Sequence, residues 1–327
     1  MLSEFLREIL RDDPLQFPRT LDDVYSKVIS ELRQEFPDLD RYRYSLDDDS
    51  AESVACQLYK IFPSHCLKFL QALAIAELAS LKEKGETDVL SWPSVTLVDI
   101  GCGAGAASVA LLALLQGYQQ FLITNGKPIS PIRVLLVGFD RSASMLELYD
   151  LVIGEYARLL SPWLIDVRYE VLAEPFPQGV RGLTRQFRPI NSHFVMLAMS
   201  NVIRSLGQSF QIGRTPWWEK IRRALRGQPP GEPGFGEAEA SAIQSILIDW
   251  ELDQVGLLGV VTSGKDDSGT PWHKNLERLT KAVRRLMSPH VSAGKGVIAR
   301  TGRFENPSES WRRKCQGRVD FSTDYYF

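Results

Sequence analysis

A glycine-rich turn between an apolar strand and a helix is the most constraining feature of this sequence. The run reads Val95-Thr96-Leu97-Val98-Asp99-Ile100-Gly101-Cys102-Gly103-Ala104-Gly105-Ala106 and continues into an alanine- and leucine-rich segment as far as Leu115. Alternating glycines allow positive φ angles and leave no Cβ between the backbone and a ligand. The helix start that follows offers free N–H groups. Strand, glycine turn and helix in this order predict an α/β fold whose backbone closely approaches a nucleotide-like ligand.

The run resembles motif I of the class I S-adenosylmethionine-dependent methyltransferases, with the pattern Asp-x-Gly-x-Gly-x-Gly at Asp99, Gly101, Gly103 and Gly105. The resemblance implies an α/β, Rossmann-like, seven-stranded, mostly parallel sheet and S-adenosylmethionine as the cofactor. It places these four residues and Cys102 among the cofactor-binding residues. In that family the glycines make room for the methionine and ribose parts of the cofactor.

Other interpretations of the turn stay open at this stage. Gly101-x-Gly103-x-x-Ala106 also satisfies the dinucleotide fingerprint, which would indicate a nicotinamide-dependent oxidoreductase. A glycine turn that binds nothing is the structural alternative. The position of Asp99, the unbroken glycine alternation and the long segment ahead of the motif favour a methyltransferase. That segment and the fourth-strand region are also similar to methyltransferase-like proteins of small-ribosomal-subunit assembly, whose cysteine cluster is absent here. A non-catalytic binding or assembly factor is therefore a further alternative.

Composition indicates an ordinary globular protein. The 327 residues are 44% hydrophobic and 24% charged, which is enough to bury a full core. No apolar run approaches the roughly 20 residues of a membrane span, and the amphipathic, acidic start at Met1 to Glu8 is typical of neither a secretory nor a mitochondrial signal. Four cysteines without paired ligand spacing predict reduced thiols, no metal site and a cytoplasmic location.

The chain divides by pattern into a helical first part and an alternating second part. Residues 1–90 predict a helical cap, with helices at 2–10, 21–36 and 47–62 and a longer one from Ser64 to Gly85. Residues 91–327 predict a methyltransferase domain with strands at 95–100, 132–139, 167–172, 194–199 and 257–262. Segments around 297–299 and 319–327 are candidates for the closing antiparallel strands. A flexible basic insert near 205–236 contains a proline- and glycine-rich stretch with no capacity to form a core.

Ligands of open α/β sheets bind at the carboxyl ends of the strands, and this rule selects further residues. Asp140 follows the second strand, and its match in the family accepts both ribose hydroxyls; the alternative role is to cap the helix that begins near Ser142. Arg141 and Met145 follow it. Leu172 and Glu174 end the third strand, where the family holds the adenine ring. Glu174 could accept the adenine amino group or be a surface acid.

Ser200 and Asn201 end the fourth strand and complete the predicted cofactor site. Methyltransferases acting on exocyclic amines often carry Asn/Asp-Pro-Pro-Tyr/Phe here, whereas this chain has neither proline nor aromatic residue. Oxygen, carbon or small-molecule nitrogen acceptors are thereby favoured. Because methyl transfer needs only alignment and the removal of one proton, one base suffices. His273, beyond the fifth strand, is the predicted catalytic base.

A basic segment surrounds the fourth strand and is the predicted acceptor surface. Between Arg181 and Arg226 the only acid is Glu219, and Trp217-Trp218 adds aromatic surface. The expected partner is a small-molecule substrate or RNA, with no membrane; the alternative is a solvated basic face. Tyr44, Tyr59 and Phe62 of the predicted cap are expected either to line a half-closed pocket at the carboxyl edge or to be plain core.

Overall fold

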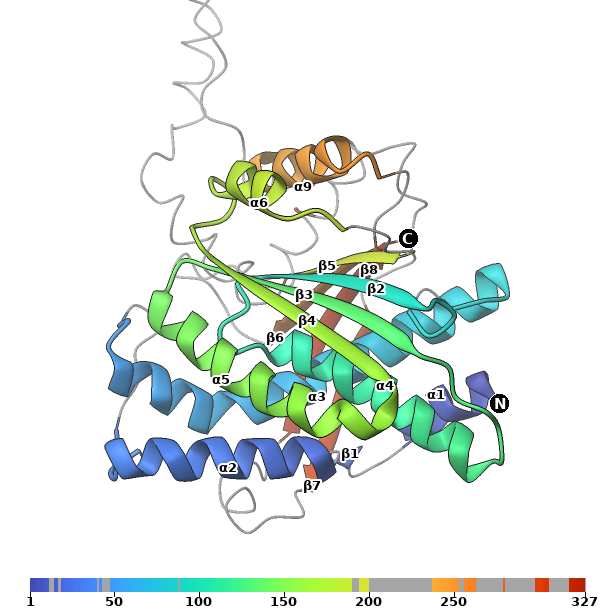
Figure 1. Ribbon diagram of the computed structural model, residues 1–327, viewed down its shortest axis with the longest axis horizontal. Coiled ribbons are helices and arrows are strands. Elements are labelled where there is room, and N and C mark those ends of the chain that lie inside the picture. The colour runs from blue at the N-terminus through green and yellow to red at the C-terminus, as the bar shows by residue number, and fades with distance from the viewer. Residues whose placement is uncertain are drawn as a thin grey trace, which may run out of the picture.

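The computed structural model describes residues 1–11, 15–16, 19–39, 41–42, 48–87, 89–189, 194–199, 237–252, 256–262, 279, 298–305 and 318–326. After three N-terminal helices, the described helices and strands alternate from β2 to β6 (Figure 1). The helices are α1 (Leu2–Arg11), α2 (Arg19–Glu35), α3 (Ala51–Lys84), α4 (Ala106–Thr124), α5 (Ala143–Leu160), α6 (Val180–Gln186) and α9 (Glu237–Asp249), with a 3-10 turn, η1, at Ser161–Trp163. The strands are β1 (Leu15–Gln16), β2 (Ser94–Ile100), β3 (Ile132–Asp140), β4 (Ile165–Ala173), β5 (Phe194–Met199), β6 (Gly256–Thr262), β7 (Ile298–Glu305) and β8 (Arg318–Tyr326).

One sheet runs through the molecule, with β2 in the middle of its five parallel strands. The strand order is β1-β7-β8-β6-β5-β2-β3-β4, and the five strands from β6 to β4 are parallel. β8 is antiparallel to both β6 and β7. The predicted α/β, Rossmann-like architecture is confirmed. The predicted count of seven strands is not, since the described residues form eight, one of them the two-residue β1 beside β7.

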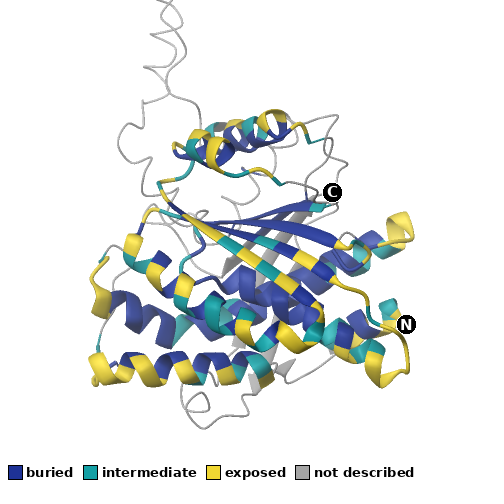
Figure 2. Ribbon diagram, viewed as in Figure 1, coloured by how far each residue is buried: buried dark blue, intermediate teal, exposed yellow. Residues whose placement is uncertain are grey.

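The two faces of the sheet are covered by different helices, and the strands supply alternate side chains to each. Val95 and Leu97 of β2 pack into the cluster formed with α1 to α5, whereas Val98 and Ile100 pack into the cluster formed with α6 and α9. Figure 2 shows the resulting pattern, with β2 buried along its whole length. This pattern explains why β2 reads as a continuous apolar run, as expected of a parallel strand covered on both faces.

The N-terminal helices lie on one face of the sheet rather than apart from it. α3 packs along α4 and also contacts β6 and β8, and α1 packs on α3. Their apolar side chains share one core cluster with α4, α5 and the strands. A cap over the carboxyl edge of the sheet is therefore not confirmed, and the division of the chain at residue 90 stays a prediction. Tyr59 and Phe62 belong to this core, and Tyr44 lies outside the described residues.

The two helices predicted at 47–62 and from Ser64 to Gly85 are a single helix, α3, so the predicted boundary between Phe62 and Ser64 is wrong. α3 begins after Ser50, whose side chain accepts a hydrogen bond from the Ser53 N–H, and ends at Gly85 with φ 81°. Pro63 has no N–H to donate to the Tyr59 carbonyl four residues earlier. The hydroxyl of Tyr25 donates to that carbonyl instead, at 2.6 Å. A partner from α2 thus compensates for the proline, and the helix continues.

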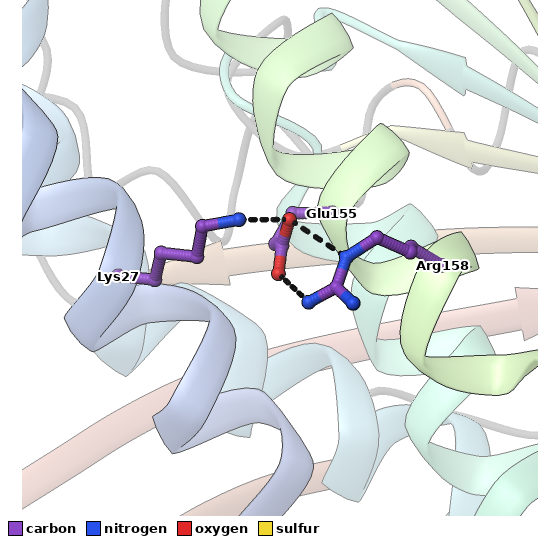
Figure 3. A network of polar contacts seen from close by, with 3 residues as sticks. All are labelled: Lys27, Glu155 and Arg158. Atoms are coloured by element: carbon purple, nitrogen blue, oxygen red, sulfur yellow. Dashed lines mark hydrogen bonds and ion pairs between the residues drawn. The ribbon is translucent and has the colours of Figure 1, made fainter.

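A three-residue ion-pair network connects α2 to α5 (Figure 3). Lys27 Nζ lies 2.6 Å from Glu155 Oε2, and Arg158 Nη2 lies 2.6 Å from Glu155 Oε1. The Glu155 side chain is only 10% exposed. Hydrogen bonds from Arg158 and then from Lys27 lower the pKa of Glu155 to about 2. One carboxylate thereby links an N-terminal helix to a helix of the sheet domain.

Helix α4 is the most apolar helix of the described chain. Its 19 residues are long and apolar enough to cross a membrane, by length and composition alone. The sequence had been expected to contain no apolar run that approaches this length. However, 67% of its apolar window is buried inside the protein, and its side chains from Ala106 to Leu115 face α3, α5 and the sheet. α4 is therefore a core helix, placed so that its first turn follows the glycine turn directly.

Candidate functional site

The glycine turn lies at the carboxyl end of β2, as predicted. Gly101, Gly103 and Gly105 have φ angles of 66°, 52° and 86°, in a region that side-chain-bearing residues rarely adopt. The Gly101 N–H donates to the Phe139 carbonyl at 2.7 Å, and the Cys102 N–H donates to the same carbonyl at 3.3 Å. The turn is thus fixed to the end of the neighbouring strand β3.

Asp140 ends β3 and accepts a hydrogen bond from the turn. Its Oδ2 accepts the Gly103 N–H at 2.9 Å, and its Oδ1 accepts the Ser142 N–H at 3.0 Å. Burial raises the pKa of Asp140, and the backbone hydrogen bonds from Ser142 and Gly103 oppose that shift. The helix cap of α5 is Ser142, which accepts the Met145 N–H at 3.2 Å. The alternative role of Asp140 as that cap is therefore wrong.

Asp99 points away from the turn and into the protein. It is 3% exposed, and its Oδ2 accepts both the N–H and the hydroxyl of Ser108, at 3.2 and 3.0 Å. Ser108 lies in the first turn of α4, whose leading N–H groups have no partner within the helix. Burial raises the pKa of Asp99 to about 7, against the opposing effect of the Ser108 hydrogen bonds. Asp99 thereby accepts a hydrogen bond from a backbone N–H of the first turn of α4.

The glycine at position 105 is required by packing as well as by φ. A Cβ there would lie 3.0 Å from Cδ2 of Tyr149 and 3.2 Å from Cδ1 of Ile153, both on α5. The side of Gly105 that lacks a side chain therefore faces the core. This differs from its predicted role as a residue that makes room for the cofactor.

The remaining predicted residues of the first three strands lie around the turn to different degrees. Cys102 is buried within it, and burial raises the pKa of its thiol. Met145 is half-buried in the first turn of α5, whereas Arg141 is exposed. Leu172, at the end of β4, packs in the core cluster of the opposite face, beneath α6. The predicted free thiols at Cys56, Cys66 and Cys102 are confirmed.

Glu174 packs against α6. A Cβ at Gly179 would lie 2.5 Å from the Glu174 Cβ, and one at Gly182 would lie 2.9 Å from its Oε1. The N-cap glycine of α6 and a glycine within the helix therefore make room for this half-buried side chain, which is not a plain surface acid. Its predicted contact with an adenine amino group stays a prediction.

Several predicted residues lie outside the described residues, and nothing is concluded about their positions. They are Ser200, Asn201, His273, Trp217-Trp218 and the insert at 205–236.

Three residues near the turn escaped sequence reasoning as site residues: Ser108, Gly138 and Tyr149. The Ser108 Oγ lies 2.9 Å from the Tyr149 hydroxyl, and a Cβ at Gly138 would meet the same ring at 2.9 Å. A glycine inside an apolar strand was the available signal, since such glycines often mark a close approach by a neighbour.

Comparisons with known proteins give structural neighbours only. No protein-family model matches the chain, and no curated sequence matches it. Loganic acid methyltransferase with SAH is 10% identical, with a TM-score of 0.35 over 76% of this chain and 67% of that chain. A Methanococcus maripaludis protein assigned to the S-adenosyl-L-methionine-dependent methyltransferases is 14% identical, with a TM-score of 0.28 over 86% of this chain and 95% of that chain. Both TM-scores lie below 0.5, so these likenesses support no assignment of function. Of these two structural neighbours, one is a methyltransferase with SAH and the other is assigned to the S-adenosyl-L-methionine-dependent methyltransferases.

Proposed function

We propose that this protein is an S-adenosylmethionine-dependent methyltransferase whose cofactor binds against the glycine turn and Asp140. The observation that carries the proposal is the junction of these two features. A turn with three positive-φ glycines ends β2, and the carboxylate that ends β3 accepts the N–H of the middle glycine, Gly103, at 2.9 Å. Both features stand at the carboxyl edge of adjacent parallel strands, where ligands of open α/β sheets bind.

The donor and acceptor groups of the site fit a ribose. Each oxygen of Asp140 accepts one backbone N–H. An ionised carboxylate has about four acceptor positions, so each oxygen keeps capacity for one hydroxyl donor. Two neighbouring hydroxyls, as on a ribose, match this arrangement. The cofactor, when bound, would supply a methyl group on a sulfonium centre.

The buried carboxylate of Asp99 favours a cofactor without phosphate at this turn. Helix starts that bind phosphate use their free N–H groups and the positive end of the helix dipole. In this chain Asp99 already accepts the Ser108 N–H in the first turn of α4. Above about pH 7, where Asp99 is ionised, its charge would also repel a pyrophosphate across a buried, weakly screened distance. This arrangement supports S-adenosylmethionine over a dinucleotide.

The acceptor side of the proposal involves residues outside the described ranges. We propose that Ser200 and Asn201 complete the cofactor site, that His273 removes the proton from the acceptor, and that the basic segment from Arg181 to Arg226 binds it. A small-molecule substrate or RNA is the proposed acceptor, and a cytoplasmic location stays a prediction. Binding of total cellular RNA at two salt concentrations, for wild type and Arg222→Glu/Arg223→Glu, separates the two classes. Each phosphate contact adds about 0.7–0.9 to the slope of log affinity against log salt concentration.

Calorimetric titration with S-adenosylhomocysteine and with NAD tests the cofactor. We expect binding of S-adenosylhomocysteine, little binding of NAD, and at least a tenfold loss of S-adenosylhomocysteine affinity in Asp140→Ala, since about 1.4 kcal/mol corresponds to a factor of ten. Asp166→Ala is the matched control, because Asp166 is exposed on the adjacent strand β4, near its amino end. Tight binding of NAD alone, or wild-type affinity in a folded Asp140→Ala variant, would overturn the proposal.

A further inference from the structure

The ring of Tyr149 occupies a space bounded by two glycines, one from the turn after β2 and one from β3. A Cβ at Gly105 would lie 3.0 Å from Cδ2 and 3.1 Å from Cε2 of this ring, and a Cβ at Gly138 would lie 2.9 Å from its Cζ. Gly105 closes the turn after β2, whereas Gly138 lies within β3 and has no positive φ. At both positions, therefore, the ring fills the volume that a side chain would need.

The hydroxyl group of Tyr149 fixes the other end of the ring. It lies 2.9 Å from Ser108 Oγ, and Ser108 Oγ donates to Asp99 at 3.0 Å. Because the hydrogen of Ser108 is directed to Asp99, the hydrogen shared with Tyr149 comes from the tyrosine. Tyr149 and Ser108 are fully buried and Asp99 nearly so, so water does not compete for these bonds. The ring therefore has little freedom to move away from the two glycines.

The glycine turn is held between Tyr149 and Asp140. Gly105 packs against the ring, and the Gly103 N–H binds the Asp140 carboxylate. The Gly105 N–H donates to the Cys102 carbonyl at 2.9 Å, so the two ends of the turn are hydrogen-bonded to each other. α5 supplies the ring, and its N-cap Ser142 also donates to Asp140.

We propose that Tyr149 is a positioning residue for the cofactor, because its ring fixes the glycine turn at the distance from Asp140 that S-adenosylmethionine requires. The inference rests on the proposed function, because it concerns a residue that positions the proposed cofactor site. Tyr149 is fully buried and lies beneath the turn, so it acts through Gly105 and Gly138 rather than on the ligand.

A double-mutant cycle between Gly138 and Tyr149 tests the proposal. The variants are Gly138→Ala, Tyr149→Leu and the two combined, with Tyr149→Phe as the conservative variant. The control is Gly117→Ala, since a Cβ there would make an ordinary contact with Phe5 at 3.6 Å. Two quantities are measured for each folded variant well below its melting temperature: the dissociation constant for S-adenosylhomocysteine, and hydrogen exchange of the amides of residues 98–108.

We expect Gly138→Ala to weaken S-adenosylhomocysteine binding about tenfold and to speed exchange in the turn, because the buried ring must shift. In the Tyr149→Leu background the same substitution should change affinity by less than about threefold, since the ring is no longer there to clash. Tyr149→Phe keeps the ring but loses the bond to Ser108, so its affinity should fall between wild type and Gly138→Ala. Gly117→Ala should stay within about threefold of wild type. Equal effects of Gly138→Ala in both backgrounds would overturn the proposal. So would lower melting temperatures with unchanged dissociation constants, the result expected of a purely structural role.

Failure of the proposed function gives a different result. A wild-type protein that binds no S-adenosylhomocysteine overturns the proposed function and the cofactor role of Tyr149 with it. The exchange data then decide the remaining claim about the turn. Faster exchange in Gly138→Ala that is absent from the double variant supports positioning of the turn by the ring, and identical exchange in all variants refutes it.

Discussion

Asp99 shows how a single buried carboxyl group couples the site to pH. Burial raises its pKa from 3.8 to about 7, although Ser108 donates two hydrogen bonds to it. In the unfolded chain the carboxyl group loses its proton near pH 4, whereas in the folded chain it keeps the proton until about pH 7. The folded state therefore binds more protons between these values, and its stability falls as pH rises through that window.

The variant Asp99→Asn should remove this pH dependence. An amide still accepts the Ser108 hydrogen bonds but carries no charge at any pH. The stability of Asp99→Asn relative to wild type should increase by on the order of 2 kcal/mol between pH 5 and pH 7 and then level off above pH 8. Urea denaturation at each pH measures it, with the exposed Asp166→Asn as control. A wild-type protein that gains stability over Asp99→Asn as pH rises would contradict the assignment.

The residues of the turn could be predicted from the sequence, but the directions in which they face could not. Gly101, Gly103 and Asp140 meet as predicted because parallel strands end at one edge of a sheet. The orientation of Gly105 toward Tyr149 could not be predicted, since the two residues belong to different elements and their contact depends on how α5 packs on β3. Local patterns specify which residues are buried, not which buried side chains touch.

Among the elements, α2 is connected to the sheet domain through Glu155 of α5. This carboxylate accepts hydrogen bonds from Lys27 at 2.6 Å and from Arg158 at 2.6 and 3.3 Å. Its pKa, lowered from 4.5 to about 2, means that the network contributes stability above about pH 4.5 and loses it as pH falls toward 2. Lys27 and Arg158 are about half exposed or more, so solvent and salt screen their interactions with it.

Removing the charge of Lys27 and removing that of Glu155 should weaken the attachment of α2 by different amounts. We expect Lys27→Met to lower the free energy of unfolding by roughly 0.5–1 kcal/mol. Glu155→Gln should lower it by roughly 1–2 kcal/mol, because two cations then lose their counter-charge. Both losses should shrink in 0.5 M salt by an amount on the order of half, as expected for screened pairs. Asp38→Asn is the control: its pair with Arg41 is exposed on both sides, and we expect no measurable change.

The strands were predictable and one helix boundary was not. The strand expected at 194–199 is β5, and those expected at 132–139 and 257–262 differ from β3 and β6 by one residue. Continuous apolar runs covered on both faces make such strands visible in sequence. The continuity of α3 through Pro63 could not be predicted, because the compensating donor, the Tyr25 hydroxyl, comes from another helix. A propensity rule cannot include a partner that is distant in the chain.

For the whole molecule, the shared core predicts that the N-terminal helices are required for folding. α3 covers α4, and residues from α1 to α5 form one cluster with the strands. Each fully buried Val, Leu, Ile, Phe or Met side chain of this cluster contributes roughly 1.5–3 kcal/mol to the free energy of folding relative to an exposed one. A fragment of residues 91–327 should therefore show no cooperative thermal transition by circular dichroism. Removal of α1 alone should leave a cooperative transition at a lower temperature. A fragment 91–327 that melts like the full chain would support an independent N-terminal unit.

The position of β8 has a consequence for folding during synthesis. β7 reaches β6 only through β8, which lies between them although it follows both in the chain. While the ribosome synthesises the chain, the edge of β6 therefore stays without its neighbour until residues 318–326 emerge. β1 is synthesised among the first residues, yet it pairs with β7 and therefore joins the sheet only when β8 has formed. The five parallel strands can pair once β6 has been made, but the open edge of β6 is then exposed to wrong pairing until β8 follows, a stage at which chaperone binding would protect it.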